Sequence, residues 1–327
     1  MNDRGRVDAP EVTVILCTYN RARLLEDTLA ALALQHTPSP LTWELLVVDN
    51  NSTDDTRAVV EAFARIAPMP VRYLYEPIQG KSNALNTGVA VARGDILAFT
   101  DDDVTPTADW VARTSSIVRQ RAADGAGGRI LPRWSSPPPT WLASDRTLLS
   151  LLALQDLDQP CSVTAENRVL IFGANMVLRR DVFLDVGPFN TAKGRLGTKL
   201  ADGEDTELID RAVAAGKRII YDPSLVVWHR IGPNRLRKRY FRKLRFDASE
   251  SEAIGTSDPS SRTLLGVPLY LLMVLPLRLG QWLLARAVFN PCAFQKELAL
   301  FSNLGFVVGH ARRRWRLAAR RPPHANS

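Results

Sequence analysis

Cysteine is scarce in this chain of 327 residues, and its three cysteines, Cys17, Cys161 and Cys292, stand far apart. This spacing excludes a disulfide framework and the paired cysteines of a zinc site, and it fits a reducing compartment. Residues 1–10 are polar and lack the apolar stretch of a secretory signal, so we expect a protein that is not exported. With 46% hydrophobic and 23% charged residues, the chain has the composition of an ordinary folded protein.

Two nucleotide-binding motifs are also missing. The stretch Gly80-Lys81-Ser82 looks like the end of a phosphate-binding loop, but Tyr75 stands where that loop needs its first glycine. The glycines of residues 125–128 do not open a helix after the first strand, so dinucleotide binding is not supported. No recognised nucleic-acid-binding module is present, and we expect no nucleic-acid partner.

Positive charge is abundant, with a formal net charge of +8, and it is concentrated in residues 230–245 and 312–321. Such blocks favour an anionic partner. Without a nucleic-acid module, the surface of an anionic membrane is the better interpretation, and a solvated basic face is the alternative.

The most apolar segment is residues 263–289, whose unbroken apolar part has 14 residues. A helix needs about 20 apolar residues to cross a bilayer, so the segment is short for a span. Pro268 and Pro276 argue against one straight helix, and Arg278 and Arg286 can reach a headgroup boundary. We expect a re-entrant or surface-lying segment, with a pair of buried core helices as the alternative.

Short apolar runs alternate with amphipathic ones in the first half of the chain, which predicts parallel strands with helices on both faces of a sheet. The expected strands are residues 12–17, 45–48, 71–75 and 96–100. The expected helices are one with leucines spaced from Leu24 to Leu32, one capped by Ser52, and one at residues 82–92.

The sequence pattern changes in the second half of the chain. A proline-rich loop is expected from Leu131 onward, with Trp134 and Trp141 in it. Further on we expect a strand at 171–178, helices at 181–186 and 204–215, a loop at 193–203, and strands at 218–221 and 225–228, the second ended by His229.

Three consecutive aspartates, Asp101, Asp102 and Asp103, follow the apolar strand at 96–100. Carboxylates at a strand tip offer the hard oxygen ligands that Mg²⁺ or Mn²⁺ prefers, usually with a phosphate completing the shell. A solvated turn rich in aspartate is the alternative.

Polar clusters also follow two other strands, at Thr18-Tyr19-Asn20 and at residues 49–52, beginning with Asp49. Ligands of open α/β sheets bind at the carboxyl ends of the strands, so we expect one shared site. Asp49 can bond a nucleobase or a ribose hydroxyl, and Lys81 can add positive charge nearby. With a bound dication, this set suits a nucleoside diphosphate.

Five stretches of the chain, in the order that the family has them, resemble the family 2 glycosyltransferases. They read VTVILCTYNR, LLVVDNNSTDDT, GKSNALNTGVAVARGDILAFTDDDV, GANMVLRRDVFLDVGPFN and GEDTELIDRAVAAGKRIIYDP with a closing VWH. The resemblance covers residues 12–229. It implies the A-type nucleotide-diphospho-sugar transferase fold, inversion at the anomeric carbon and a divalent cation.

The resemblance also implies residue roles. Nucleotide binding would fall to Thr18, Tyr19, Asp49, Lys81, Asn86, Asp101 and Asp102, metal binding to Asp101, Asp103 and His229, and catalysis to Glu204 and Asp205. The triple aspartate leaves the metal assignment open by one residue. Asn50 stands where the family often has an acid, and a structural histidine is the alternative at His229.

Single-displacement inversion requires a base that takes the proton of the attacking hydroxyl. Gly203, Glu204 and Asp205 open a helix after a loop, and we expect Asp205 to be this base. Acids also stabilise a helix start without catalysis, and which of the two acids is the base stays open.

The sequence therefore predicts a glycosyltransferase that moves one sugar from a UDP-, GDP- or dTDP-sugar to a glycan or lipid-linked acceptor at the cytoplasmic face of the membrane. The Gln-x-x-Arg-Trp signature of processive synthases is absent, which favours single transfer. We expect a nucleotide-sugar-binding half at 1–130, an acceptor and catalytic half at 131–235 and a basic, apolar extension at 236–327. The alternatives are a catalytically silent nucleotide-sugar-binding scaffold and a sugar nucleotidyltransferase.

Overall fold

The computed structural model describes residues 9–167, 169–195, 199–200, 203–255 and 262–319. The chain divides into two compact units. The first unit comprises Met1–Thr191 with Gly203–Leu236, and the second comprises Ala192–Asp202 with Arg237–Ser327. Part of the loop expected at residues 193–203 lies outside the described residues.

The described residues of the first unit contain one nine-stranded sheet, in the order β3-β2-β1-β4-β8-β6-β9-β5 with β7 beside β9. The strands are β1 (Val12–Thr18), β2 (Trp43–Asp49), β3 (Val71–Tyr75), β4 (Ile96–Asp101), β5 (Val104–Pro106), β6 (Gly125–Trp134), β7 (Cys161–Ser162), β8 (Met176–Arg179) and β9 (Ile219–Ile231). Strands β1 to β4 pair in parallel, and β8 runs antiparallel between β4 and β6. The expected α/β fold with a mostly parallel sheet is confirmed.

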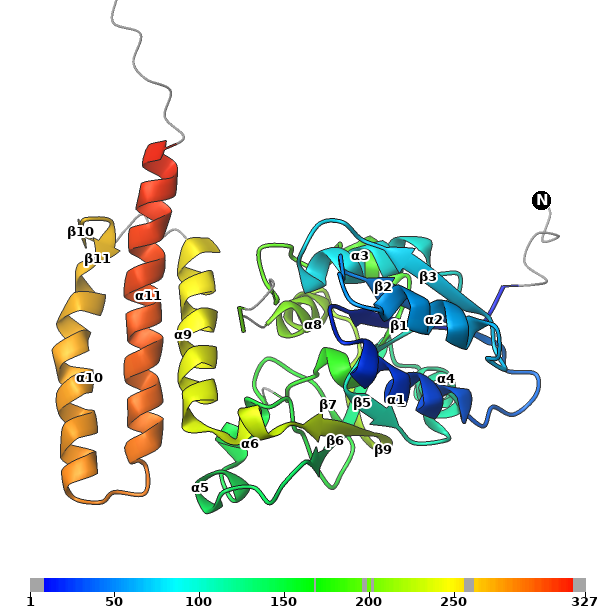
Figure 1. The fold of residues 1–327 in the computed structure, drawn as a ribbon, viewed down its shortest axis with the longest axis horizontal. Helices are drawn as coiled ribbons and strands as arrows, with labels where there is room; N and C mark the ends of the chain where they lie inside the picture. Colours follow the sequence, from blue (N-terminus) through cyan, green and yellow to red (C-terminus); the bar gives the residue numbers. More distant parts are fainter. Residues whose placement is uncertain (1–8, 168, 196–198, 201–202, 256–261, 320–327) are drawn as a thin grey trace, which may run out of the picture. The chain divides into compact units, whose positions relative to one another are not determined.

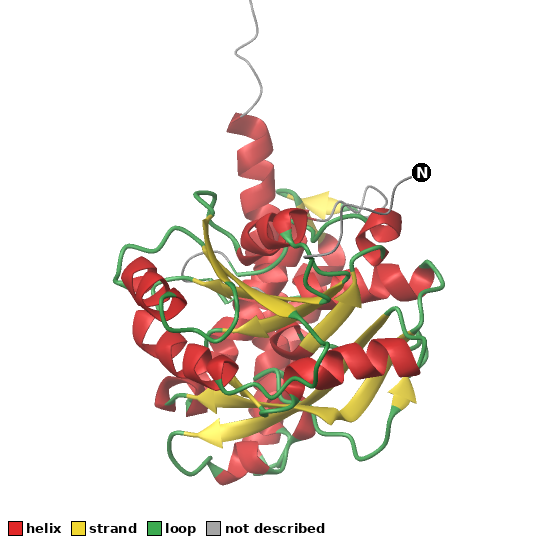
Figure 2. Ribbon diagram, turned by 90° about the vertical axis from the view of Figure 1, so that its right-hand side faces the viewer, coloured by secondary structure: helices red, strands yellow, loops and turns green. Residues whose placement is uncertain are grey.

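Helices cover both faces of this sheet, as Figure 2 shows. Helix α3 approaches β1 closely because residue 88 is glycine: a Cβ there would lie 2.7 Å from a methyl group of Ile15. Val14 and Leu16, the neighbours of Ile15, point to the opposite face, since side chains alternate along a strand. The helical elements are α1 (Ala22–Ala33), α2 (Thr56–Ala64), α3 (Lys81–Val91), α4 (Trp110–Gln120), α5 (Thr140–Ala143), α6 (Arg146–Ser150), η1 (Gly173–Asn175), α7 (Val182–Val186), α8 (Glu204–Ala214) and η2 (Pro233–Leu236).

The prediction that Ser52 caps a helix is wrong, because α2 begins only at Thr56. The Ser52 hydroxyl instead accepts a hydrogen bond of 2.9 Å from the backbone N–H of Asn20. Asn20 has a φ of 50°, a conformation that asparagine tolerates well. This hydrogen bond joins the loops after β1 and β2. The serine hydroxyl accepts a backbone N–H, as it would in a helix cap, but from a residue distant in the sequence.

Two predicted boundaries in the second half are also wrong. The expected loop at residues 131–134 is the end of β6, and the two strands expected at 218–228 are one strand, β9, with His229 inside it. Residues Arg129–Trp134 pair in parallel with Val226–Ile231. This long-range pairing overrides the local proline signal. The expected strand at 171–178 likewise begins as the 3₁₀ turn η1 and becomes β8 only at Met176.

The second unit is mainly helical, as predicted for the C-terminal extension. Its elements are α9 (Lys238–Gly255), β10 (Thr263–Leu264), β11 (Val267–Pro268), α10 (Leu269–Ala287) and α11 (Ala293–Ala319). Helix α11 packs against both α9 and α10 (Figure 1). Gly305 and Gly309 allow the close approach to α9, since a Cβ at either would lie within 2.5 Å of an α9 carbonyl oxygen.

Helix α10 is the main element of the apolar segment. It is one helix of 19 residues with Pro276 inside it, and Pro268, the other proline that argued against one straight helix, stands just before its first residue. It is not part of a buried helical pair, since its buried residues are Leu271 and Ala285. By length and composition alone, α10 is the one helix in the described part of the chain that is able to cross a membrane.

Candidate active site

The carboxyl ends of β1, β2 and β4 bring the three predicted polar clusters together. In the strand register, Thr18 of β1 lies opposite Asp49 of β2, and Cys17 lies opposite Asp101 of β4. Strand β1 therefore stands between the two acidic strand ends, at the point where the strand order turns back from β1 to β4. This is the position at which open α/β sheets bind ligands.

Asp49 is buried, and its carboxylate accepts two hydrogen bonds. One comes from the backbone N–H of Ser52 at 2.9 Å and the other from the Tyr73 hydroxyl at 2.7 Å. Burial raises the pKa of Tyr73, and the Asp49 carboxylate raises it further, so Tyr73 stays a donor. Tyr19 follows Thr18 in the loop after β1 and is half-buried.

Asn50 joins the end of β2 to the loop that begins α3. Its Oδ1 accepts the N–H of Gly80 at 2.8 Å, and its Nδ2 donates to the carbonyl of Ile78 at 2.8 Å. An acid at this position would keep the first bond and lose the second. Asn50 thus holds the loop that carries Lys81, a role that the sequence comparison treated only as a departure from the family.

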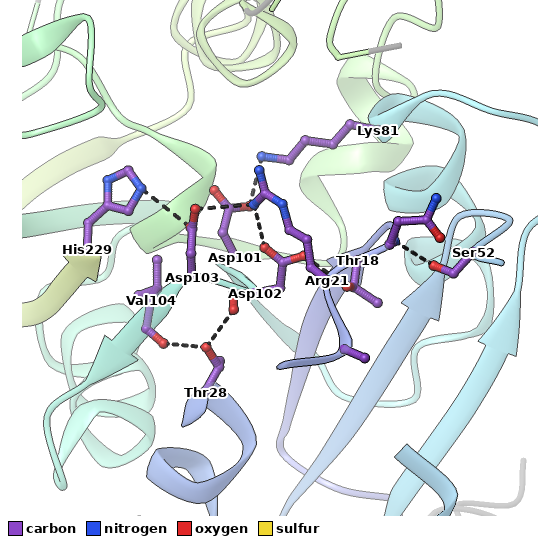
Figure 3. A network of polar contacts seen from close by, with 12 residues as sticks. Thr18, Arg21, Thr28, Ser52, Lys81, Asp101, Asp102, Asp103, Val104 and His229 are labelled. Atoms are coloured by element: carbon purple, nitrogen blue, oxygen red, sulfur yellow. Dashed lines mark hydrogen bonds and ion pairs between the residues drawn. The ribbon is translucent and has the colours of Figure 1, made fainter. Parts of the chain in front are cut away.

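Each of the three consecutive aspartates has a cationic partner, and Figure 3 shows Lys81 and Arg21 beside them. The pairs are Lys81 Nζ with Asp101 at 2.8 Å, Arg21 Nη1 with Asp102 at 2.7 Å, and Arg235 Nη2 with Asp103 at 2.7 Å. Arg21 and Arg235 were not among the predicted site residues. The edge is therefore a set of compensated charges, not the solvated turn that was the alternative.

Asp102 is buried and ties β4 to β1. Its Oδ2 accepts the Thr18 hydroxyl at 2.8 Å, while Oδ1 faces Arg21. Burial raises the pKa of Asp102 against the lowering effect of Arg21. The Thr28 hydroxyl, on α1, lies 3.0 Å from the Asp102 carbonyl oxygen and fixes the turn from below (Figure 3).

Asp103 and His229 meet across β5 and β9, which pair in antiparallel fashion. His229 Nε2 lies 3.4 Å from Asp103 Oδ1 and 2.6 Å from Arg235 Nη1. Burial alone would raise the pKa of Asp103, but His229 and Arg235 outweigh it and hold that pKa well below its usual value. His229 Nδ1 is buried without a hydrogen-bond partner among the described residues.

The predicted metal ligands carry suitable donors, namely two carboxylates and an imidazole with an unpartnered buried nitrogen. Their chemistry fits a divalent cation. They are not gathered as a ready ligand set, since no group of three or more His, Cys, Asp and Glu side chains in the described ranges is arranged to hold a metal. Lys81 and Arg235 hold Asp101 and Asp103 instead.

Lys81 connects the aspartates to the predicted catalytic acids. Its Nζ lies 3.5 Å from Glu204 Oε1, and a Cβ on Gly173 would lie within 4 Å of both Lys81 Nζ and Asp205. Burial lowers the pKa of Lys81, but Asp101, Glu204 and Asp205 together raise it above its ordinary value. Lys81 is therefore a permanent cation shared by both acidic groups.

The two acids at the start of α8 differ in environment. Glu204 is buried with Oε2 unpartnered among the described residues, and burial raises its pKa to about 7. Asp205 is half-buried, and its carboxylate accepts the N–H of Gly173 at 2.7 Å and that of Thr206 at 2.8 Å.

The model of glycosyl transferase family 2 matches residues 13–187, more than half of the chain. The chain is a family 2 glycosyltransferase. The succinoglycan biosynthesis protein ExoM of Rhizobium meliloti (strain 1021) is 28% identical to it over 242 residues, which cover 73% of each chain.

Solved structures share the fold of this glycosyltransferase. The mannosyltransferase PcManGT from Pyrobaculum calidifontis, in complex with GDP-Man and Mn²⁺, matches 98% of this chain and 77% of its own, with a TM-score of 0.56 and 21% identity. S. aureus TarS 1-349, in complex with UDP-GlcNAc, matches 93% of this chain and 92% of its own, with a TM-score of 0.53 and 16% identity. In a longer TarS chain the likeness covers 42% of the length. The expected A-type fold is confirmed.

The glycosyltransferase places most of its predicted site residues in one network, from Thr18 through the aspartates and Lys81 to the α8 acids. Asn86 has a different environment: its amide bonds the backbone N–H and carbonyl of Phe189, at 2.8 and 2.9 Å. Sequence reasoning missed Arg21, Arg235 and the loop-holding role of Asn50. Arg21 directly follows the predicted Thr18-Tyr19-Asn20 cluster, which was the available signal for it, whereas Arg235 sits in a basic run that offers no such signal.

Proposed function

We propose that this glycosyltransferase transfers a single sugar, with inversion and with a divalent cation, from a nucleoside-diphosphate sugar to an acceptor hydroxyl in glycan, polysaccharide or glycolipid assembly. The observation that carries the proposal is the position of Lys81. It links Asp101, at the end of β4, to the acids that open α8. A donor-binding edge and a candidate base are thus parts of one electrostatic network.

In this proposal the donor lies along the carboxyl ends of β1, β2 and β4. The residues proposed to bind its nucleotide are Thr18, Tyr19, Asp49, Lys81, Asn86, Asp101 and Asp102. A dication held by Asp101, Asp103 and His229 would offset the negative charge of the departing diphosphate. The neighbours described with GDP-Man and Mn²⁺ and with UDP-GlcNAc support a nucleotide-sugar donor. We keep UDP-, GDP- and dTDP-sugars as candidates.

Asp205 is the proposed base, and Glu204 supports it. Glu204 is 4% exposed and faces Lys81, whereas Asp205 is half-buried and more open to an acceptor. Asp205 would take the proton of the acceptor hydroxyl as its oxygen forms the bond to the anomeric carbon. The bond from that carbon to the diphosphate oxygen breaks on the opposite face, so configuration inverts and the nucleoside diphosphate leaves.

A thermal-shift panel of UDP, GDP and dTDP, each with and without Mn²⁺, tests the donor part of this proposal. We expect one diphosphate to raise the melting temperature clearly more with Mn²⁺ than without it, since a ligand that binds only the folded state stabilises it. A sugar nucleotide carrying the same base, incubated with Mn²⁺, should then release that diphosphate slowly by hydrolysis. An equal rise in melting temperature with and without Mn²⁺ would contradict the metal site. No rise in melting temperature with any diphosphate would contradict the donor site.

We also propose that the second unit binds the cytoplasmic surface of an anionic membrane, where a lipid-linked or growing glycan acceptor would lie. Large apolar side chains are exposed along α10 and its flanks: Leu264, Leu265, Leu269, Tyr270, Met273, Leu277, Leu279, Leu283, Leu284, Val288 and Phe289. Patches of this kind mark interaction surfaces. The segment 237–327 also holds 16 of the 42 Lys and Arg residues but 5 of the 34 Asp and Glu residues, which suits anionic headgroups.

Helix α10 is proposed to lie in the interface and not to span it. Arg278 is its tenth residue of 19, and a span would place this charge near the bilayer centre. An arginine there costs about 3 kcal/mol on insertion scales. In the interface, Arg278 and Arg286 reach headgroups while the leucines enter the acyl boundary.

A further inference from the structure

Arg235 occupies the position that the proposed metal would need. It lies in the short turn η2, just after β9, and its side chain is 14% exposed. Its two terminal nitrogens contact two different predicted ligands, Asp103 Oδ2 at 2.7 Å and His229 Nε2 at 2.6 Å. A guanidinium has donors and no acceptor, so on Asp103 it engages the carboxylate lone pair that a cation would take.

Each aspartate of the edge has a cationic partner before any ion arrives. Three carboxylates face three cations, each pair within 2.8 Å. A dication that binds Asp103 needs the carboxylate oxygen that Arg235 engages, and two cations so close together in a mostly buried place repel each other strongly. One of the resident cations therefore has to move.

Arg235 is the cation whose two contacts are both predicted metal ligands, Asp103 and His229. Lys81 is also engaged by Glu204. Arg21 bonds Asp102 at 2.7 Å and reaches Asp103 Oδ2 only at 3.2 Å, whereas Arg235 reaches it at 2.7 Å. Arg235, in contrast, belongs to a turn whose preceding residues, Pro233 and Asn234, are exposed.

We propose that Arg235 is an exchangeable counterion: it holds Asp103 and His229 in the ion-free enzyme and gives way to the dication when a nucleoside diphosphate arrives. This inference rests on the proposed metal dependence. The diphosphate supplies the negative charge that the displaced guanidinium and the dication both need. Metal and nucleotide binding are therefore coupled, and the coupling is reciprocal. Arg235 is a positioning residue in this scheme.

The test is Mn²⁺ binding to the full chain, measured by calorimetry with and without UDP or GDP. Arg235→Gln removes the competing charge, so we expect it to bind Mn²⁺ about tenfold more tightly than the wild type without nucleotide, a change of about 1.4 kcal/mol. For Arg235→Gln, the increase in Mn²⁺ affinity on adding the diphosphate should be smaller than for the wild type. Arg235→Lys, which keeps a charge, should fall between the two.

Arg237→Gln is the matched control, because Arg237 is exposed and lies two residues further on. It removes the same charge and should leave Mn²⁺ affinity unchanged. If Arg235→Gln binds Mn²⁺ no more tightly than the wild type, or if Arg237→Gln matches it, the inference is wrong while metal use stands. If neither the wild type nor any variant binds Mn²⁺ in the presence of UDP or GDP, the proposed metal dependence is wrong, and the inference is wrong with it. A melting curve of each variant shows whether it is folded.

Discussion

The two units of this enzyme differ in how their charged residues are paired. In the first, acids at the carboxyl edge of the sheet are buried or half-buried and held by cations at fixed distances, as with Asp102 and Arg21 or Asp101 and Lys81. In the second, a few buried acids such as Glu250 are paired, while basic residues remain in large excess. The net charge of +8 comes from the segment 237–327, since the rest of the chain has more acids than bases.

This difference shows how charge reports on function. Matched charges held at fixed distances in a buried place are suited to chemistry, because they interact strongly and shift one another's pKa. Unmatched charges beside exposed leucines are suited to an extended anionic surface. If these roles are separate, changes in the first unit should affect catalysis and changes in the second should affect membrane binding.

The largest effect is expected for Asp205→Asn in the first unit. The amide keeps an acceptor for the Gly173 N–H and loses the ability to take a proton, so turnover should fall about 100-fold or more. Donor binding, measured by calorimetry, should persist. Asp210→Asn, at an exposed position of the same helix, should behave as wild type. Near-normal transfer by Asp205→Asn would remove Asp205 from the role of base.

Glu204→Gln should change how stability depends on pH. The pKa of Glu204 is raised to about 7 from 4.5, chiefly by burial, so its contribution to stability is present below about pH 4.5 and is lost as pH rises to about 7. The loss corresponds to about 3 kcal/mol. Urea unfolding of the metal-free protein at pH 5 and pH 8 should therefore show a smaller difference for the variant than for the wild type.

The control for this measurement is Glu207→Gln on the same helix. The Glu207 carboxylate meets Arg211 at 2.9 Å at the surface, and the variant should keep the wild-type difference between the two pH values. If Glu204→Gln and Glu207→Gln give the same pH response, the buried acid does not control it.

Leu277→Asp tests the second unit. Burying one leucine is worth about 2 kcal/mol, so affinity for vesicles with anionic lipid should fall at least about tenfold while sugar transfer to a soluble acceptor is unchanged. Ile66→Asp makes the same change at an exposed apolar residue of the first unit and should bind vesicles normally. If the wild-type protein does not bind vesicles and sediments as a dimer, the exposed face of α10 binds a second copy of the chain and not a membrane.

The smallest effect is expected for Asn50→Asp. It removes the hydrogen bond to the Ile78 carbonyl and should lower the free energy of unfolding by about 1 kcal/mol, with a several-fold loss of diphosphate affinity as the Lys81 loop loosens. Asn51→Asp adds the same charge and keeps its acceptor for the Tyr75 hydroxyl, so it should cause less change. Equal losses in both variants would point to charge alone, not to the Asn50 amide.

The first four strands were predictable because each is a short apolar run, as β4 at Ile96–Asp101 shows, whereas β5 and helix α4 were not predicted. The misplaced elements depend on distant partners. Pro132 and Trp134 read locally as a loop, yet they continue β6 because β9 runs beside them. Ser52 reads as a cap, yet its hydroxyl bonds Asn20, 32 positions earlier.

By itself, the sequence determined the first four strands, the family and the acids that gather at the sheet edge, because periodicity and motifs are properties of neighbouring residues. The partners of those acids were decided only by the tertiary structure. Arg235 reaches Asp103 from 132 positions away, and Arg21 reaches Asp102 from 81. Electrostatic energy depends on distance in space and on burial, neither of which a linear sequence records.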